Sequence, residues 1–390
     1  MNVRPSSGNG QGAAVVVIGG GVTGLSAAWW LARGGVDVLV IDKGIVGWEA
    51  SGRNGGGAAH SFSPLFAEEQ RLWPLMDEML GYPTEYRPKR IRVALTEAQL
   101  DYYCRVADLA TSQGFRWEKL DRKQLKELAA LVTDEAVGGV LLHFGGQANP
   151  QRTVQAFAWA LQDLGGRIQQ HTTVTEMRRK GGKVTEIVTD RGTFGCDHVV
   201  IAAGPQTGLL AQMIGIDLPL AFARLEQIVT EPVPLMKMGW VDGNGLYGRQ
   251  TLRGNLAFGG GPHDWIEIDG MRAPFASSTF VMRHLAKRVA QLFPYAAQAR
   301  VIRSWAGLVE VTPDGRPVID RLSDPDNVVL ATMASVGFGL CPATGHAIQQ
   351  LVVDGKCTFA DLSGFNLERL RNVAPGWREK RGWLPPVSAA

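Results

Sequence analysis

The chain has 390 residues, of which 20% are charged, and its formal net charge at pH 7 is +3. A chain of this length buries a large core and is expected to form two domains. So small a net charge excludes the strong field that steers a protein to nucleic acid or to an anionic membrane surface, and no apolar run approaches the roughly 18–20 residues of a membrane-spanning helix.

The N-terminus and the cysteines indicate where the protein works. Residues 1–12 are polar and lack the apolar stretch of a secretory signal peptide, so we expect a disordered leader. The four cysteines stand singly, without the Cys-x-x-Cys pairs of zinc or iron–sulfur sites. This sparse usage is typical of the reducing cytoplasm, and we predict a cytoplasmic protein without a metal.

The first elements predicted along the chain are a strand, a glycine-rich turn and a helix. Residues 14–18 are apolar and β-branched, as in a fully buried strand, and a helix rich in small residues follows up to Arg33. Between them Gly19, Gly21 and Gly24 fit the pattern G-x-G-x-x-G. The first glycine permits the tight turn, the second lets the backbone approach a pyrophosphate, and the third lets helix and strand pack closely. A phosphate would lie at the helix N-terminus, where free N–H groups favour anions.

A second buried strand, residues 36–41, leads directly to Asp42 and Lys43. Asp42 lies about 20 residues beyond the last glycine, where a dinucleotide-binding fold places the carboxylate that accepts hydrogen bonds from a ribose. The agreement of glycine pattern, strand and carboxylate favours dinucleotide binding over an ordinary strand–helix–strand unit with a solvated Asp42.

A glycine-rich stretch without hydrophobic periodicity, residues 47–57, comes next. A flexible surface loop is one interpretation, but its hydroxyl, amide and guanidinium groups also suit a loop wrapped over a bound anion or ring. With the preceding motifs, the run from Ala50 to Gly56, ASGRNGG, resembles the FAD-dependent D-amino-acid oxidase superfamily. That group includes glycine oxidase, the sarcosine oxidases, and opine and hydroxyproline dehydrogenases. The resemblance extends from about residue 13 to 370.

The resemblance implies an α/β fold. A Rossmann-like FAD-binding domain of the GR2 type is expected, with an interleaved α+β substrate domain built on a mostly antiparallel sheet. The predicted divisions are residues 13–90, 145–220 and 303–365 for the FAD-binding domain, 91–144 and 221–302 for the substrate domain, and 366–390 for a C-terminal tail.

From residue 65 to 164, amphipathic helices alternate with short strands. We interpret the part up to residue 135 as scaffold, and Asn149-Pro150 is typical of a helix start. The expected elements are strands over residues 90–95 and 138–142 and helices over 98–113, 122–131 and 153–164.

The start of the last of these helices bears on a second flavin. In the heterotetrameric sarcosine oxidases, as the resemblance implies, this place carries a histidine covalently attached to FMN. Residues 151–156 contain no histidine. A covalent FMN is therefore not expected here, whereas a non-covalent FMN at a subunit interface stays open.

Residues 166–196 alternate apolar and polar side chains around glycine turns, which predicts a β-meander. The resemblance implies that Val174 contacts the adenine through its backbone. Residues 198–204 follow as another buried parallel strand, and open α/β sheets bind ligands at the carboxyl ends of their strands. Ala203 and Gly204 are therefore expected to contact FAD.

From about residue 220 to 302 the pattern changes to strands broken by turns. The expected elements are strands over residues 224–229, 245–249 and 255–259 and a helix over 277–292. We assign them to the substrate domain, which would cover the flavin. Tyr247 and Arg249 lie on one of these strands, where a sheet can direct polar groups at a ligand; a solvated strand face is the alternative.

The C-terminal third carries further matches to the family. Residues 303–319, which include Trp305 and Gly307, precede a returning strand at 327–332. Residues 335–353 then repeat the glycine loop and helix of the N-terminus. The resemblance implies that this loop lies against the pyrimidine end of the flavin, where the helix dipole stabilises negative charge on the reduced ring.

The motifs and the resemblance together define the candidate site. The expected cofactor-binding residues are Gly19, Gly21, Gly24, Asp42, Lys43, Ala50, Ser51, Arg53, Asn54, Gly55, Gly56, Val174, Ala203, Gly204, Gly307, Gly337, Phe338, Gly339 and Leu340. The candidate catalytic residues are Tyr247, Arg249, Arg53 and Trp305. FAD is expected to be bound non-covalently.

Two positions depart from the family pattern. In glycine oxidase and D-amino-acid oxidase, an arginine after Ala-Gly-Leu binds the substrate carboxylate. Here that position is Val309, followed by Glu310, so Arg53 or Arg249 would have to bind a carboxylate. Sarcosine oxidases place a lysine after Gly-Phe that assists the reaction with oxygen, whereas this chain has Gly339. The first departure disfavours a glycine or D-amino-acid substrate, and the second favours a dehydrogenase that passes electrons onward, with partner subunits as candidate acceptors.

The resemblance implies an FAD-dependent oxidoreductase that oxidises the C–N bond of a secondary amine or N-substituted amino acid, such as sarcosine, iminodiacetate, an opine or hydroxyproline. Hydride transfer to FAD would be followed by hydrolysis of the imine. Two alternatives stay open: a glycine, D-amino-acid or primary amine oxidase that uses oxygen, and a non-catalytic FAD-binding subunit of a complex. No nucleic acid or membrane partner is expected.

Overall fold

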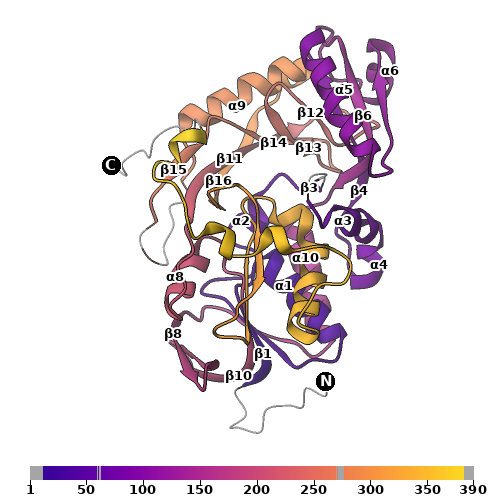
Figure 1. Cartoon of the computed structure of the whole chain (residues 1–390). Helices are drawn as coiled ribbons and strands as arrows, with labels where there is room; N and C mark the ends of the chain where they lie inside the picture. The colour runs from indigo at the N-terminus through magenta and orange to yellow at the C-terminus, as the bar shows by residue number, and fades with distance from the viewer. Residues whose placement is uncertain (1–11, 59, 61–62, 269, 271–275, 382–390) are drawn as a thin grey trace.

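The protein folds around two β-sheets that lie one above the other in Figure 1. The computed structural model describes residues 12–58, 60, 63–268, 270 and 276–381. The first sheet, with α1 and α10, occupies the lower half of the view, and the second sheet, with α9, occupies the upper half. The α/β fold class predicted from the sequence is confirmed.

The first sheet has a parallel centre, in the order β17-β18-β10-β1-β2-β7. Its central strands are buried apolar runs, as expected where helices or other layers cover both faces. The strands are β1 (Ala13–Ile18), β2 (Val38–Ile41), β7 (Arg167–Gln169), β10 (Gly192–Ile201), β17 (Val318–Arg321) and β18 (Val328–Thr332), and β8 (Val174–Lys180) and β9 (Lys183–Thr189) continue the sheet from β10. The carboxyl ends of β1, β2, β10 and β18 therefore lie at one edge, where ligands bind in such sheets.

Three helices pack on one face of this sheet: α1 (Val22–Arg33), α7 (Pro150–Asp163) and α10 (Gly337–Val353). Small residues bring α1 and α10 close together. Ser26 Oγ donates to the Cys341 carbonyl at 2.8 Å, and a Cβ on Gly345 would stand 2.1 Å from Ser26 Oγ. The other face is covered by the β8–β9 hairpin and α8 (Thr207–Gln212).

The second sheet is mostly antiparallel and has ten strands, in the order β15-β11-β14-β13-β12-β4-β6-β3, with β16 paired to β11 and β5 paired to β6. Its strands are β3 (Gly57–Ala58), β4 (Arg87–Ala94), β5 (Trp117–Leu120), β6 (Gly138–Gln147), β11 (Ala221–Pro232), β12 (Val241–Gly243), β13 (Leu246–Gln250), β14 (Asn255–Gly260), β15 (Asp264–Ile266) and β16 (Val301–Val311). The remaining helices are α3 (Phe66–Leu72), α4 (Met76–Leu80), α5 (Glu97–Thr111), α6 (Arg122–Leu128) and α9 (Thr279–Leu292).

Most expected elements are present, with bounds shifted by a few residues. The stretch 47–57 differs from the expected loop, because Ala50–Arg53 forms a one-turn helix, α2. Residues 301–311, in part within the predicted FAD-binding segment 303–365, form β16 and pair with β11 of the second sheet. The domain division itself stays a prediction. Residues 1–11 of the expected leader and 382–390 of the tail lie outside the described residues.

The structure bears on disulfides, membrane-spanning helices and metal sites. All four cysteines are free. Among the described helices, none is long and apolar enough to cross a membrane. The described residues contain no group of three or more His, Cys, Asp or Glu side chains arranged to hold a metal ion.

Candidate functional site

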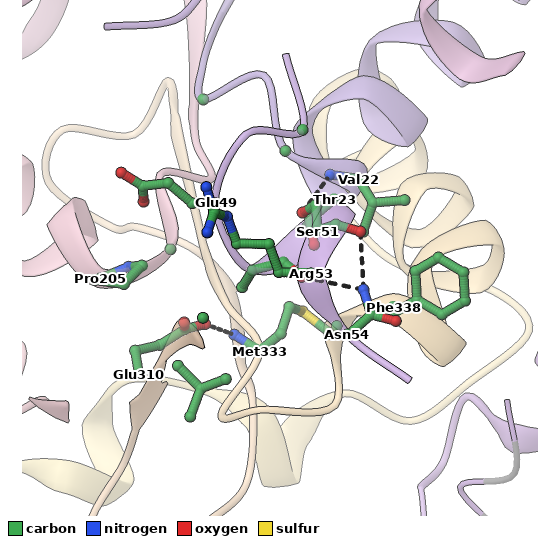
Figure 2. Close-up of a pocket in the computed structure, with 18 of the residues that line it drawn as sticks. Val22, Thr23, Glu49, Ser51, Arg53, Asn54, Pro205, Glu310, Met333 and Phe338 are labelled. Atoms are coloured by element: carbon green, nitrogen blue, oxygen red, sulfur yellow. Dashed lines mark hydrogen bonds between the residues drawn. The ribbon is translucent and has the colours of Figure 1, made fainter. Parts of the chain in front are cut away.

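A cavity of about 330 Å³ runs from the carboxyl edge of the first sheet to the inner face of the second. The β1–α1 turn, the end of β2, α2 and the start of α10 line one part, and β11, β13 and β16 contribute the opposite wall. Figure 2 shows this cavity with Ser51, Arg53, Glu310 and Phe338 around it.

The β1–α1 turn brings bare backbone to the cavity. Gly19 has φ +115°, and a Cβ there would stand 2.3 Å from the Ala202 carbonyl oxygen. A Cβ on Gly24 would stand 2.0 Å from the Gly19 oxygen, so this glycine permits helix and strand to pack but does not line the cavity. Gly21 does line it, at the N-terminus of α1. The turn therefore offers N–H groups and the positive end of the helix dipole to an anion.

Asp42 lies at the end of β2 and lines the cavity. Its Oδ2 accepts from the Gly20 N–H at 2.6 Å, and its Oδ1 accepts from the Gly44 N–H at 2.7 Å. Burial raises the pKa of Asp42, although both N–H donors act against that rise. The neighbouring Lys43 Nζ lies 2.7 Å from Glu49 Oε1. Asp42 thus ties the glycine turn to the end of β2.

Side-chain hydrogen bonds, some of them drawn in Figure 2, join α2 to the start of α1 and fix the shape of the glycine-rich run. Ser51 Oγ accepts from the Val22 N–H at 2.9 Å and so caps the start of α1. Asn54 Nδ2 donates to the carbonyls of Ala50 and Ser51 at 3.1 and 2.8 Å, and its Oδ1 accepts from the Gly56 N–H at 2.8 Å. These bonds give the glycine-rich run a defined shape over the cavity.

Arg53 joins α2 to the second sheet. Its Nε donates to the Trp48 carbonyl at 2.7 Å and its Nη1 to the Ala306 carbonyl at 3.1 Å. Trp305 Nε1 in turn donates to the Arg53 carbonyl at 2.8 Å. Burial lowers the pKa of Arg53. Trp305 does not line the cavity, and its contact is with the backbone of α2.

The second sheet contributes polar side chains that have no partner among the described residues. The buried hydroxyl of Tyr247 and the buried Oε1 of Gln227 both lack one, and both residues line the cavity. Burial raises the pKa of Tyr247, so the phenol stays a neutral donor and acceptor. Gln206, beyond the end of β10, presents two further unpartnered amide atoms.

Arg249 lies behind this wall and not on it. Its Nη1 donates to the Gly55 carbonyl at 2.8 Å, and a Cβ on Gly56 would stand 2.9 Å from the same Nη1. Burial lowers the pKa of Arg249 to about 10. The guanidinium therefore supports the glycine-rich run from the side of the second sheet.

Glu310 on β16 lines the cavity and is 7% exposed. Its Oε1 accepts from the Met333 N–H at 2.9 Å and from Thr332 Oγ1 at 3.1 Å, and Figure 2 shows the first of these bonds. Burial raises its pKa. Beyond Met333, Ala334 and Ser335 have φ +46° and +75°, a left-handed backbone that costs about 1–2 kcal/mol per residue and turns the chain into α10.

The cavity brings together most of the residues predicted from the sequence. Those that line it are Gly19, Gly21, Asp42, Lys43, Ala50, Ser51, Arg53, Asn54, Gly55, Gly56, Val174, Ala203, Gly204, Tyr247, Gly307, Gly337, Phe338 and Gly339. Four do not: Gly24, Arg249, Trp305 and Leu340.

Sequence reasoning gave no role to several residues that line the cavity, among them His60, Gln227, Trp240 and Glu310. Gln227 and Trp240 carry no local signal, because only the pairing of distant strands brings them here. His60, by contrast, lies three residues after the glycine-rich run, and Glu310 is a carboxyl within the otherwise apolar run of residues 305–311.

The residues present fit FAD. The Gly19–Gly21 turn and the start of α1 suit a pyrophosphate, and the Asp42 carboxylate suits a ribose hydroxyl. Toward the second sheet, the unpartnered atoms of Gln206, Gln227 and Tyr247 suit a polar ring system. The start of α10 adds a second helix N-terminus on the same cavity.

Comparisons with known proteins agree with this geometry. The β subunit of sarcosine oxidase from Rhizobium meliloti (strain 1021) is 28% identical over 87% of this chain and 84% of its own length. Glycine oxidase from Geobacillus kaustophilus is 29% identical over 91% of this chain and 96% of its own length. A subunit of opine oxidase from Rhizobium meliloti is 27% identical over 91% and 97%.

Solved structures of amino-acid oxidoreductases share the fold of this chain. The crystal structure of glycine oxidase from Geobacillus kaustophilus superposes with a TM-score of 0.83 at 25% identity, over 93% of this chain and 100% of that one. L-proline dehydrogenase from P. horikoshii shares the fold, with a TM-score of 0.81 at 21% identity over 96% and 99%. The family model of the FAD dependent oxidoreductases (DAO) matches residues 14–351, and the chain belongs to that family of flavin enzymes.

Proposed function

We propose that the protein oxidises the C–N bond of a secondary amine or N-substituted amino acid. FAD supplies the acceptor for the hydride, which carries both electrons. Water then hydrolyses the imine product to a carbonyl compound and a smaller amine, or, for a ring amine such as hydroxyproline, to a single ring-opened product. Candidate substrates are sarcosine, iminodiacetate, opines and hydroxyproline.

One observation carries the proposal: the nucleotide cavity of the first sheet continues to a polar wall on the second. Tyr247 and Gln227 present an unpartnered hydroxyl and amide oxygen on that wall. Unpartnered buried polar atoms cost free energy, about 1–3 kcal/mol each, unless a ligand satisfies them. An amine or amino acid has both the donors and the acceptors that would do so.

The relatives support a secondary amine. Sarcosine oxidase and opine oxidase subunits are among them, by their names enzymes of N-substituted amino acids. Val309 stands where the resemblance implies an arginine in glycine oxidase, and so disfavours that family's mode of carboxylate binding. Arg53, which lines the cavity, is the proposed alternative for a carboxylate, whereas Arg249 lies behind the wall and supports the glycine-rich run.

Two rival functions remain. The glycine oxidases among the relatives favour a primary amine or D-amino acid with oxygen as acceptor. A non-catalytic FAD-binding subunit is the third candidate, because several relatives are subunits of larger oxidases.

The cofactor, partners and location are proposed as follows. FAD is expected to be bound non-covalently. Partner subunits receive the electrons, with a non-covalent FMN at their interface as an option. A cytoplasmic location is supported by four free cysteines.

Anaerobic mixing of the FAD-loaded protein with a panel of amines tests the proposal. The panel contains sarcosine, iminodiacetate, opines, hydroxyproline, glycine and D-amino acids, and flavin bleaching is followed. Bleaching by a secondary amine supports the proposal, whereas bleaching by glycine or D-amino acids alone favours the first rival. Bleaching by none favours the non-catalytic subunit. Air is then admitted, and slow reoxidation supports a dehydrogenase.

A further inference from the structure

His60 lies where two cavities meet. It lines the cofactor cavity, and it also lines a second cavity of about 300 Å³ bounded by α5, β6 and the loop around Arg316. Val336, just before α10, borders both as well. The side chain of His60 is 24% exposed, so the imidazole is accessible from the cavities.

A buried carboxylate holds this histidine. Glu69, on α3, has no exposed surface. Its Oε1 lies 3.1 Å from His60 Nδ1, and its Oε2 accepts from the His60 backbone N–H at 3.3 Å. No lysine or arginine of the described chain forms an ion pair with Glu69. Because Nδ1 faces the carboxylate, Nε2 is the ring nitrogen left for a ligand.

The space for the imidazole is created by Gly339 at the start of α10. An ideal Cβ on Gly339 would stand 2.2 Å from His60 Cε1 and 2.7 Å from His60 Nδ1. Trp73 Nε1 fixes this backbone by donating to the Gly339 carbonyl at 2.7 Å. The imidazole therefore occupies the volume that a larger residue at position 339 would need.

The other titratable groups near the pair do not compete for a proton. Burial, and after it the charge of Glu69, raises the pKa of both Tyr86 and Cys341, so both stay neutral. The Glu69 carboxyl, which has no exposed surface, therefore has the backbone N–H and the imidazole of His60 as its hydrogen-bond partners.

Three guanidinium groups across the second cavity share two carboxylates. Arg90 Nη2 lies 2.6 Å from Asp242 Oδ2, and Arg92 Nε lies 4.0 Å from Oδ1 of the same residue. Arg316 Nε lies 3.1 Å from Asp314 Oδ2. The fourth polar group there, the phenol of Tyr103, has its pKa raised by burial, so it too stays neutral.

We propose that His60, oriented by Glu69, is the proton acceptor for the ammonium group of the substrate. An amine bound as R2NH2+ transfers one N–H proton to His60 Nε2, which leaves the nitrogen lone pair free. The α-carbon then loses its hydrogen with both electrons to FAD as the lone pair forms the C=N bond. The inference rests on the proposed function and adds a residue to it.

A comparison of His60→Asn with wild type across pH tests this role. The asparagine amide still reaches Glu69 as a donor but takes up no proton. An aliphatic ammonium has a pKa near 10, so about one molecule in a thousand is neutral at pH 7. Without the acceptor, the rate of anaerobic flavin reduction should be about 1000-fold below wild type at pH 7 and should rise about tenfold per pH unit, nearing wild type at about pH 10. His143→Asn is the matched control, since His143 Nε2 lies 2.7 Å from Glu118 outside both cavities.

An unreactive probe separates this inference from the proposed function. 2-Aminoisobutyrate has no α-hydrogen, so its binding to the FAD-loaded protein is read from the flavin absorbance without oxidation. We expect His60→Asn to bind it at least tenfold more weakly than wild type at pH 7 and equally at high pH. A loss of the same size at every pH, in rate or in binding, would reduce His60 to a structural residue and overturn the inference. So would wild-type protein that shows no absorbance change with the probe.

Discussion

Asp42 combines two roles that one substitution can separate. In the structure its carboxylate accepts from the N–H groups of Gly20 and Gly44, which joins the phosphate turn to the end of β2. The FAD-bound protein should add a third bond, from a ribose hydroxyl. Asp42→Ala removes both carboxylate oxygens and with them all three hydrogen bonds. Asp42→Asn replaces one oxygen with an amide donor that faces an N–H.

The magnitudes follow from the bonds lost. A hydrogen bond to a charged group contributes about 1.5–3 kcal/mol. Removal of the two backbone bonds should lower the stability of the FAD-free protein by about 2–4 kcal/mol, since the burial that raises the pKa of Asp42 offsets part of their sum. The ribose bond, at about 1.5–3 kcal/mol, corresponds to a roughly 10- to 150-fold weaker affinity for FAD.

The two effects are measured separately: unfolding of the FAD-free protein in urea, and titration with FAD followed by quenching of its fluorescence. Asp37→Ala is the matched control, because Asp37 precedes the same strand, pairs with Arg167 at 2.9 Å and lies outside the cavity. It should change stability by about 0–1 kcal/mol and leave FAD affinity intact. Unchanged FAD affinity in Asp42→Ala, with stability lost, would refute the ribose contact. Asp42 would then only join the glycine turn to the end of β2.

Three further substitutions test the other walls of the cavity. Burial raises the pKa of Glu310, so its stabilising protonation is complete below the usual glutamate range and is lost as pH rises through the folded-state value. Glu310→Gln should therefore gain Tm relative to wild type as the pH rises above the usual glutamate range; a constant difference would contradict a raised pKa at Glu310. Gly56→Ala and Gly81→Ala both force an alanine into a left-handed backbone at about 1–2 kcal/mol, but only a Cβ on Gly56 meets backbone, at 2.1 Å. FAD titration should show lost affinity for Gly56→Ala alone. Arg249→Met should raise the apparent KM for the amine severalfold because the Gly55 carbonyl loses its donor; unchanged steady-state kinetics would remove Arg249 from the site.

Local motifs predicted the nucleotide half of the site. The turn at Gly19 and Gly21, and Asp42 at the end of the next strand, are neighbours in sequence as well as in space, and each residue type has a conformational or chemical reason to be there. For this half of the site, the structure adds local detail, such as the helical turn over Ala50–Arg53.

The wall on the second sheet depends on which strands pair. Gln227 and Tyr247 face the cavity because β11 pairs with both β14 and β16, and β13 pairs with β14. Alternation within a strand indicates which residues share a face but not which strand lies beside it, so Arg249 could be assigned to the sheet and yet not placed behind the wall. Trp305 falls within the predicted FAD-binding segment 303–365, whereas it lies on β16 of the second sheet.

The sequence position of Glu69 indicates a buried carboxyl, but periodicity alone does not identify its partner. Phe66, Glu69 and Leu72 fall on one face of α3, and all three are buried. A carboxylate on the apolar face of an amphipathic helix needs a partner from elsewhere in the chain, and here the partner is His60. Its identity follows only from the folded chain.

The central claim is that FAD bound in this cavity takes a hydride from the α-carbon of a secondary amine. The most direct measurement is an anaerobic single turnover with the panel amine that bleaches the flavin, followed by analysis of the products. The account predicts one equivalent of carbonyl compound and one of the smaller amine for each FAD reduced. Flavin reduction without cleavage of a C–N bond, or cleavage of primary amines only, would contradict it.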